Sequence, residues 1–367
     1  MEYPTKKHMT GVEGAHRRAV YKAMGFTDED LSRPLIAVVN SWGEVCPGHF
    51  GLNMLTAKVK EGVWQSGATP VEFGVISQCG TLTLGLDGIR YDLSTREVMS
   101  FEIETIVNSQ MFDGIVFMTA CDKVVPGMLI AAARLNLPSI VVCAGVMGAG
   151  ELDGQAFSLS DLDEQVMGSY PVGKASAEKI RRMEEQACPT WGACPLMGTA
   201  NTMQCLAEAV GLCLPGTSTM LATSSEILRA AKHAGNQIVE LVQKGIRARD
   251  VMSREAMDNM IMMMMALGGS TNSVVHILSL AQELGYDDTV TLDFISEVSR
   301  RTPCLVNVKP NGPYHQTDFE KCGGMPVVMQ ELRKQLHTGA LTVTGATLGE
   351  NLDAEEPHEI DRNVIYS

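Results

Sequence analysis

The sequence predicts an α/β fold, in which a three-layer, doubly wound and mostly parallel sheet carries an added helical region. Four short apolar runs indicate the strands, at residues 34–40, 70–77, 114–120 and 138–143. Amphipathic stretches separate these runs, so we expect a helix between each pair of strands. Continuous apolar strands that alternate with helices are typical of a parallel sheet covered on both faces.

The remaining elements follow in chain order. Between the strands, the periodicity predicts helices at 52–65, 94–109 and 127–135. From residue 175 onward the pattern is mostly helical, with helices expected at 175–186, 199–212, 225–244, 253–267, 273–284 and 292–298. The Met-rich run 261–265 favours a buried helix over an adaptable binding surface. Short strands are expected again near 341–344.

The composition restricts the class of protein and its partners. Hydrophobic residues make up 45% and charged residues 20% of the 367 residues, which is typical of a globular protein. The formal net charge of −14 predicts no nucleic-acid or anionic membrane partner, because no basic surplus exists to neutralise phosphates. No apolar stretch is long enough to span a bilayer, and the N-terminus lacks the apolar core of a signal peptide. We therefore expect a cytoplasmic protein whose ten cysteines form no disulfide framework.

Four cysteines lie where a ligand site is expected. Cys46, Cys79 and Cys121 each follow a predicted strand, and ligands bind outside the carboxyl ends of strands in open parallel sheets. Cys194 lies in a small-residue turn before a predicted helix, where the helix N-terminus would favour its thiolate. Thiolates are the ligands that iron–sulfur clusters require. Because no tight Cys-x-x-Cys run is present, buried structural cysteines remain the alternative at this point.

The two residues after Cys121 add a different chemistry. Asp122 offers hard oxygen ligands of the kind that Mg²⁺ prefers, and Lys123 offers an ammonium that could bind a substrate carboxylate. The alternative is a solvated ion pair at the end of a strand.

These motifs resemble the dihydroxy-acid dehydratase and phosphogluconate dehydratase family, and the resemblance extends over nearly the whole chain in one register. The matching motifs are Asn40-Ser41-Trp42, Pro47-Gly48-His49, Tyr91 with Ser94-Thr95-Arg96-Glu97, Cys121-Asp122-Lys123 with Pro126-Gly127-Met128, Gly192-Ala193-Cys194, Thr199-Ala200-Asn201-Thr202-Met203, Leu214-Pro215-Gly216, Gly268-Gly269-Ser270-Thr271-Asn272 with His276, Gly323-Gly324-Met325-Pro326 and Leu341-Thr342-Val343-Thr344-Gly345.

The resemblance implies an iron–sulfur-dependent hydro-lyase. Such an enzyme removes water from a 2,3-dihydroxy carboxylic acid or a sugar acid and yields a 2-keto acid. Carried to the matching positions, Cys121 and Cys194 would bind the cluster, and Asp122 would bind Mg²⁺. Lys123, as a carbamate, would be a further Mg²⁺ ligand and a catalytic residue. Homo-oligomerisation is also implied by the resemblance alone.

The third cluster ligand is left open between Cys46 and Cys79, with Cys79 slightly preferred. Members with a two-iron cluster carry Cys where this chain has Gly48. The form found here resembles the four-iron branch, so a 4Fe-4S cluster is expected rather than a 2Fe-2S cluster. Cys143, at the end of the fourth predicted strand, is expected to belong to the core.

The expected Mg²⁺ site departs from the family pattern. The family carries an Asp in the loop after the second strand, where this chain has Gly80 or Thr81. Either Asp87 replaces it, or the Mg²⁺ site is weakened; Asp87 is better interpreted as a turn residue.

The substrate-binding candidates lie in two other segments. His49 is expected near the cluster, in contact with substrate or with the cluster's surroundings. Ser270 or Thr271 would either cap the following helix or help to bind an anion at its N-terminus. His276 is expected to be a core histidine.

The family's β-rich C-terminal domain, which supplies a catalytic Ser, has no counterpart in this sequence. We therefore expect residues 1–350 to form the N-terminal iron–sulfur domain and residues 351–367 to form a tail or severed linker. A second subunit carrying the β-rich domain would complete the enzyme; the alternative is that this sequence is a truncated form of the longer enzyme. The alternatives are a non-catalytic, cluster-binding regulatory homologue and a zinc-dependent lyase.

Overall fold

The centre of the molecule is a four-stranded parallel sheet. In the computed structural model, which describes residues 5–367, the strands are β1 (Leu35–Asn40), β2 (Thr69–Gly74), β3 (Gly114–Thr119) and β4 (Ser139–Cys143). Their spatial order is β2-β1-β3-β4, and each neighbouring pair is parallel. β1 and β3 are buried along their whole length, as expected for continuous apolar runs. The predicted α/β class and its four strands are confirmed.

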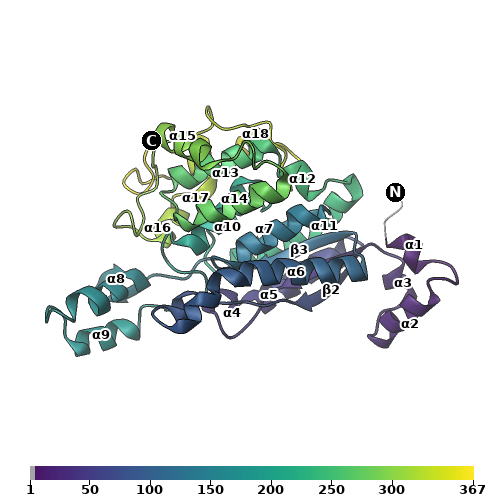
Figure 1. Cartoon of the computed structure of the whole chain (residues 1–367), viewed down its shortest axis with the longest axis horizontal. Helices are drawn as coiled ribbons and strands as arrows, with labels where there is room; N and C mark the ends of the chain where they lie inside the picture. The colour runs from purple at the N-terminus through teal and green to yellow at the C-terminus, as the bar shows by residue number, and fades with distance from the viewer. Residues whose placement is uncertain (1–4) are drawn as a thin grey trace.

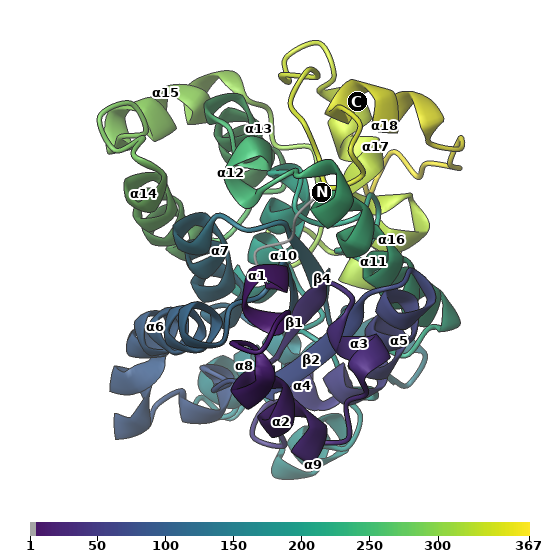
Figure 2. The same cartoon turned by 90° about the vertical axis from the view of Figure 1, so that its right-hand side faces the viewer.

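The strand order makes the sheet doubly wound. The chain leaves β1 through helix α5 (Leu52–Gln65) to β2, and returns through α6 (Asp92–Gln110) to β3 on the other side of β1. Because such crossovers are right-handed, connections that run in opposite directions place their helices on opposite faces. Figure 2 shows α6 and α7 (Val124–Leu135) on one side of the sheet and α5 and α11 (Ser225–Lys244) on the other. The winding therefore reverses between β1 and β3.

Helices α5 and α11 approach each other backbone to backbone. A Cβ on Gly62 would lie 2.1 Å from the carbonyl oxygen of Lys232, and a Cβ on Gly235 would lie 2.1 Å from that of Val59. Any side chain at either glycine would push the helices apart. Since α11 also packs on β3 and β4, this contact joins the later part of the chain to the sheet.

The predicted helical region packs beside the layer formed by α6 and α7 (Figure 1). Its Met-rich helix α13 (Arg254–Ala266) is buried from Met260 to Met264, which confirms the expected buried helix. The other α-helices are α1 (Lys6–Met9), α2 (Ala15–Ala23), α3 (Asp28–Leu31), α4 (Pro47–Phe50), α8 (Leu159–Glu164), α9 (Ala177–Glu184), α10 (Thr199–Ala209), α12 (Ala248–Val251), α14 (Asn272–Leu284), α15 (Leu292–Arg301), α16 (Gln316–Lys321), α17 (Gly324–Glu331) and α18 (Leu348–Ala354).

The prediction of short strands near 341–344 is wrong. Leu341 makes only an isolated bridge with Thr347, and Gly345 adopts a φ of +79°. The Thr342 hydroxyl accepts a hydrogen bond from the backbone N–H of Thr344, so side-chain bonding stabilises a turn there instead of a strand.

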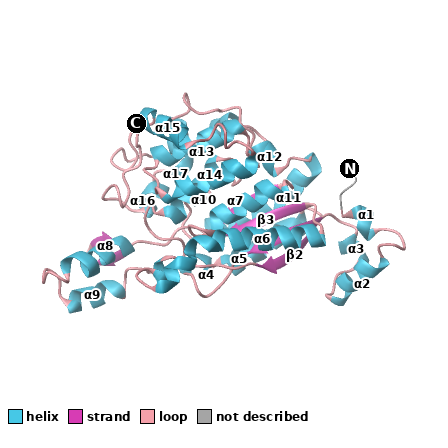
Figure 3. Cartoon of the chain, viewed as in Figure 1, coloured by secondary structure: helices cyan, strands magenta, loops and turns pink. Residues whose placement is uncertain are grey.

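An arm extends from the body, and the sequence predicted only one of its elements, the helix at 175–186, which is α9. It consists of the hairpin β5 (Gly150–Leu152) and β6 (Gln155–Phe157), followed by α8 and α9 (Figures 1 and 3). Phe157, Met183 and Ala187 form a small apolar cluster of its own. The hairpin and α8 are short and mostly exposed, so they carry too little periodicity to be predicted.

The last segment is partly packed on the body, although its acidic sequence suggested a tail or linker. Val364 and Ile365 are buried, and the backbone N–H of Tyr366 donates to the carbonyl oxygen of Leu305. Among the described residues, no helix has the length and apolar character needed to cross a membrane.

We predict that Gly235→Ala lowers the free energy of unfolding by at least about 2 kcal/mol, because the added methyl group collides with the α5 backbone. Urea denaturation of the purified chain measures this. The matched control is Gly339→Ala, since nothing lies within 4 Å of a Cβ at that exposed position. Equal stabilities of the two variants would contradict the proposed close packing.

Candidate metal centre and substrate cavity

Two buried thiols meet where the winding of the sheet reverses. Cys46 is the N-cap residue of α4, after β1, and Cys121 lies two residues after the end of β3. Their Sγ atoms are 3.2 Å apart. The carboxyl ends of β1 and β3 diverge at this point, which is the usual ligand-binding crevice of an open α/β sheet.

The backbone around this pair is specialised. Cys121 has a φ of +63°, a left-handed conformation that costs on the order of 1 kcal/mol or more for a residue other than glycine. A Cβ on Gly48 would lie 2.7 Å from the Cys121 Sγ and 3.6 Å from the Cys46 Sγ. The missing side chain at position 48 therefore leaves room for the two thiols.

The other two predicted thiols lie in the same region. Cys79, in the loop after β2, interacts with Cys46, and this interaction together with burial raises the pKa of Cys79. Cys194 is held by the pairing of Ala193 with Val146, just beyond the end of β4. Burial and the nearby Cys79 raise the pKa of Cys194 to about 11. These thiols lie close enough to hinder one another's ionisation. A bound metal would stabilise the thiolates by its positive charge, so this group of thiols matches the donor set of a soft metal centre.

His49 faces the same pair of thiols. Its ring lies with the Cys46 and Cys121 thiols in a group whose ligand atoms are all within 4.8 Å of one another. The His49 Nδ1 is 2.9 Å from the Ser41 hydroxyl, and its Nε2 has no partner among residues 5–367. Burial lowers the pKa of His49 to about 4, so the ring is neutral at pH 7.

A cavity of ≈ 340 Å³ opens beside the thiols. Its wall includes Cys79, Gly80, Thr81, Leu84, Ile89, Asp92, Cys121, Asp122, Lys123, Leu159, Ser160, Asp163, Cys194, Leu196, Gly198, Thr199, Ala200 and Asn272. Three of the four predicted cysteines therefore border one space together with Asp122 and Lys123. Cys46 lies behind Cys121 and is not part of the wall.

Lys123 is the centre of the charged part of this cavity. Its Nζ lies 2.6 Å from Asp122 Oδ2 and 2.7 Å from Asp92 Oδ2. Burial opposes the ammonium charge, but the two carboxylates outweigh it and raise the pKa of Lys123. Sequence reasoning missed Asp92, which is distant in the chain from Asp122. Asp87, the acid considered instead, is exposed and pairs with Arg90 at 3.3 Å, as its interpretation as a turn residue predicts.

The turn before α14 reaches the cavity indirectly. The Ser270 hydroxyl is 2.7 Å from that of Thr199, and the Asn272 amide donates to Thr199 at 3.2 Å. Thr271 is the N-cap residue of α14 but makes no side-chain capping bond. Thr199 and Asn272, rather than Ser270 and Thr271, line the cavity. The sequence could have indicated Asn272, since it is the last residue of the motif Gly268-Gly269-Ser270-Thr271-Asn272.

His276 is buried in the helical region, as expected for a core histidine. Its Nδ1 is 3.1 Å from the Arg96 guanidinium, which can only donate, so Nδ1 is the accepting nitrogen. Burial and the charge of Arg96 lower the pKa of His276 to about 3.

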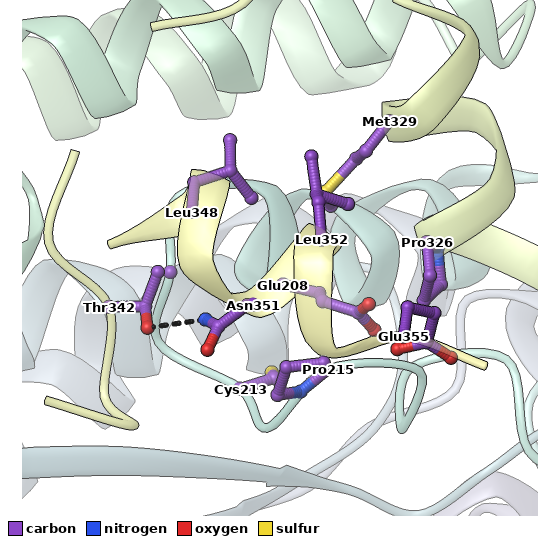
Figure 4. Close-up of a pocket in the computed structure, with 11 residues that line it drawn as sticks. Glu208, Cys213, Pro215, Pro326, Met329, Thr342, Leu348, Asn351, Leu352 and Glu355 are labelled. Atoms are coloured by element: carbon purple, nitrogen blue, oxygen red, sulfur yellow. Dashed lines mark hydrogen bonds between the residues drawn. The ribbon is translucent and has the colours of Figure 1, made fainter. Parts of the chain in front are cut away.

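A second hollow lies between α10 and the C-terminal segments (Figure 4). Its volume is only ≈ 20 Å³, too small for a substrate. The Glu208 carboxylate at its base accepts hydrogen bonds from the backbone N–H groups of Gly216 and Ser218. Burial raises the pKa of Glu208 to about 7. Because both of its oxygens are bonded to the 214–218 turn, Glu208 anchors that turn.

Comparison with known proteins decides the family. The profile of the dihydroxy-acid/6-phosphogluconate dehydratase N-terminal family matches residues 33–351. This chain belongs to that family. The match includes all four cysteines described above and the cavity beside them.

Curated relatives align over nearly all of this family member. A dihydroxy-acid dehydratase of Caldicellulosiruptor saccharolyticus is 46% identical over 357 residues, which are 97% of this chain and 64% of the relative. Relatives from Oleidesulfovibrio alaskensis (dihydroxy-acid dehydratase) and Methanosarcina acetivorans (dihydroxy-acid dehydratase 1) are 44% and 43% identical, and this chain covers 65% and 62% of their lengths. The chain thus spans just under two thirds of the length of these relatives.

The depressed pKa of His276 predicts a pH dependence of stability. The unfolded chain binds a proton at this residue below pH 6.5 and the folded chain does so only near pH 3, so stability falls as the pH decreases through this window. Between pH 7 and pH 5 this residue contributes a loss of about 2 kcal/mol. The variant His276→Gln keeps an acceptor for Arg96 but does not titrate. Between pH 7 and pH 5, its free energy of unfolding should therefore fall by about 2 kcal/mol less than that of the unaltered chain, as measured by urea denaturation. Identical losses would show that His276 titrates normally in the fold.

Proposed function

We propose that this chain carries the cluster-binding part of a hydro-lyase that dehydrates a 2,3-dihydroxy carboxylic acid or a sugar acid. In the overall reaction, the proton on C2 and the hydroxyl on C3 leave, and the resulting enol tautomerises to a 2-keto acid. The observation that carries this proposal is one cavity that combines soft thiol donors with a hard-oxygen and lysine group. The names of the relatives support the same reaction class.

In this proposal Cys121 and Cys194 bind an iron–sulfur cluster, together with Cys46 or Cys79. The donor set fits, because these thiols are crowded, largely buried and in need of a positive partner when ionised. The Cys46 thiol lies 3.2 Å from that of Cys121, which favours Cys46 as the third ligand. Cys79, by contrast, lines the cavity, which favours Cys79. We propose a four-iron cluster, because the sequence at Gly48 resembles the four-iron branch of the family.

Asp122 and Lys123 would hold Mg²⁺, with Lys123 as a carbamate. The fit rests on the hard oxygens present and on the unpaired Asp92 Oδ1 beside them. When bound, the cluster and the Mg²⁺ supply Lewis-acid polarisation of the leaving hydroxyl and of the substrate carboxylate.

The chain's own residues bind and orient the substrate. Thr199 and Asn272 present a hydroxyl and an amide to the cavity, and Ser270 fixes the position of Thr199. Ser270 would thus act on the substrate through Thr199, whereas Thr271 would act only by beginning α14 next to Asn272. His49 is neutral and would contact the cluster side of the thiol pair rather than the substrate.

This chain matches about two thirds of each relative's length. The base that removes the C2 proton would come from sequence equivalent to the remaining third. The relatives carry that length within a single chain, so they give no support to a separately encoded second subunit. Homo-oligomerisation remains part of the proposal. No observation favours a non-catalytic regulatory role.

Anaerobic purification, followed by visible spectroscopy and assays of iron and acid-labile sulfide, tests the cluster and its ligands. We predict a brown protein with equal iron and sulfide, near four of each per chain. Cys121→Ser and Cys194→Ser should lose most of the iron, because serine is a poor ligand for these irons. Cys304→Ser, an exposed cysteine outside the cavity wall, is the control. A colourless chain that resists reconstitution, or full iron in both cluster variants, would refute the proposal; zinc in its place would favour the lyase alternative.

Lys123→Arg tests the carbamate. Arginine keeps the positive charge beside Asp122 but cannot form a carbamate at neutral pH, so it would repel a divalent cation. We predict that bicarbonate strengthens Mn²⁺ binding to the unaltered chain and has no effect on Lys123→Arg, as measured by the EPR signal of free Mn²⁺. Bicarbonate-dependent binding in the variant would contradict the carbamate assignment.

A further inference from the structure

We propose that Asp92 is a ligand of the divalent-cation site, and that it supplies the carboxylate that the loop after β2 lacks in this chain. This inference rests on the proposed function, because it concerns the same Mg²⁺ site. It assigns to that site a residue at the start of α6, outside the Cys121-Asp122-Lys123 motif.

The first observation is geometric convergence. Asp92 and Asp122 come from different layers of the fold, one from the first residue of α6 and one from the loop after β3. Both place a carboxylate oxygen within 2.7 Å of the same atom, Lys123 Nζ. The side chains are 13%, 22% and 8% exposed for Asp92, Asp122 and Lys123, respectively. Two carboxylates therefore share one cation in a largely buried place.

The second observation is an unsatisfied atom. The Oδ2 of Asp92 is paired with Lys123, but its Oδ1 is buried and has no hydrogen-bond partner in the described part of the chain. Leaving a buried carboxylate oxygen unpaired costs roughly 1–3 kcal/mol. A bound cation would remove that penalty, whereas the ion pair with Lys123 alone does not.

The third observation concerns Gly80. Its φ of −60° and ψ of −31° are ordinary for any residue, so backbone conformation does not require glycine there. A Cβ on Gly80 would, however, lie 2.9 Å from Asp92 Oδ1 and 3.4 Å from Asp92 Cγ. The Asp92 carboxylate thus lies where a side chain from position 80 would begin. A side chain at position 80 or one at position 92 could therefore place a carboxylate in the same small space, but not both at once.

Charge balance then links the metal to the carbamate. To form the carbamate, the Lys123 ammonium first loses a proton. The neutral amine then adds to the carbon of CO₂, so that an N–C bond forms while a C–O π bond opens to give an oxyanion. A second proton leaves the nitrogen, and the side chain has changed from a cation to an anion. Asp92 and Asp122 would then lose the one cation that pairs with them among residues 5–367, and they would face a third negative group. Mg²⁺ prefers hard oxygen ligands and restores the balance, so carbamate formation and metal binding require each other.

Mn²⁺ binding by EPR in bicarbonate buffer, with the purified full chain, separates the ligand role from a structural one. Asp92→Asn should weaken Mn²⁺ binding about tenfold or more, as should Asp122→Asn. Asp87→Asn removes an exposed carboxylate from the neighbouring turn and should bind as the unaltered chain does. The decisive variant is Gly80→Asp combined with Asp92→Ser, which should bind at least several-fold more tightly than Asp92→Ser alone. Circular dichroism and melting temperature verify the fold of each variant.

Unchanged Mn²⁺ affinity in Asp92→Asn, with loss in Asp122→Asn, would overturn the role of Asp92 and leave the proposed function intact. A folded double variant that binds no better than Asp92→Ser would overturn the claim that positions 80 and 92 supply the same ligand. If the unaltered chain bound no Mn²⁺, both the metal site and the role of Asp92 would fall. The iron and sulfide assays would still report separately on the cluster.

Discussion

The reversal of winding between β1 and β3 is the constraint on which the candidate site depends. At this point the chain leaves two adjacent strands toward opposite faces of the sheet, so the loops that follow them separate and leave a crevice. Cys46 and Cys121 occupy these two loops, with their thiols 3.2 Å apart and buried. The close contact between α5 and α11 supports this arrangement, because it covers the face of the sheet opposite α6 and α7.

The cavity has two chemical halves. One half presents sulfur atoms, which suit soft iron, and the other presents carboxylates and Lys123, which suit a hard cation. The proposed substrate is an acid, which would carry negative charge into a chain whose own net charge is −14. Local cations are therefore needed to hold it, and the structure places Lys123 at the only part of the described cavity wall with a basic side chain. The metals proposed for this site would strengthen that local field.

Absent side chains shape the site as much as present ones do. Gly48 leaves space for two thiols, and Gly80 leaves space for the Asp92 carboxylate. Neither glycine has a positive φ, so space rather than backbone freedom is their role. Cys121 shows the opposite case: it adopts a left-handed conformation that glycine would tolerate better, and keeps its thiol. Backbone strain retained at a thiol-bearing position is consistent with a functional requirement for that side chain.

The sequence by itself determined the α/β class, the four strands, the main helices and the family, because apolar periodicity and short motifs are local properties of the chain. It also indicated that Cys46, Cys79 and Cys121 would follow strands. It predicted the helix at 175–186 but not the rest of the arm, at 150–169, nor the packing of Val364 and Ile365, because these short segments carry little periodicity. Only the tertiary structure decided that Asp92, rather than Asp87, faces Lys123. That choice depends on how the start of α6 docks against the loop after β3, a contact between segments about thirty residues apart that no local pattern records.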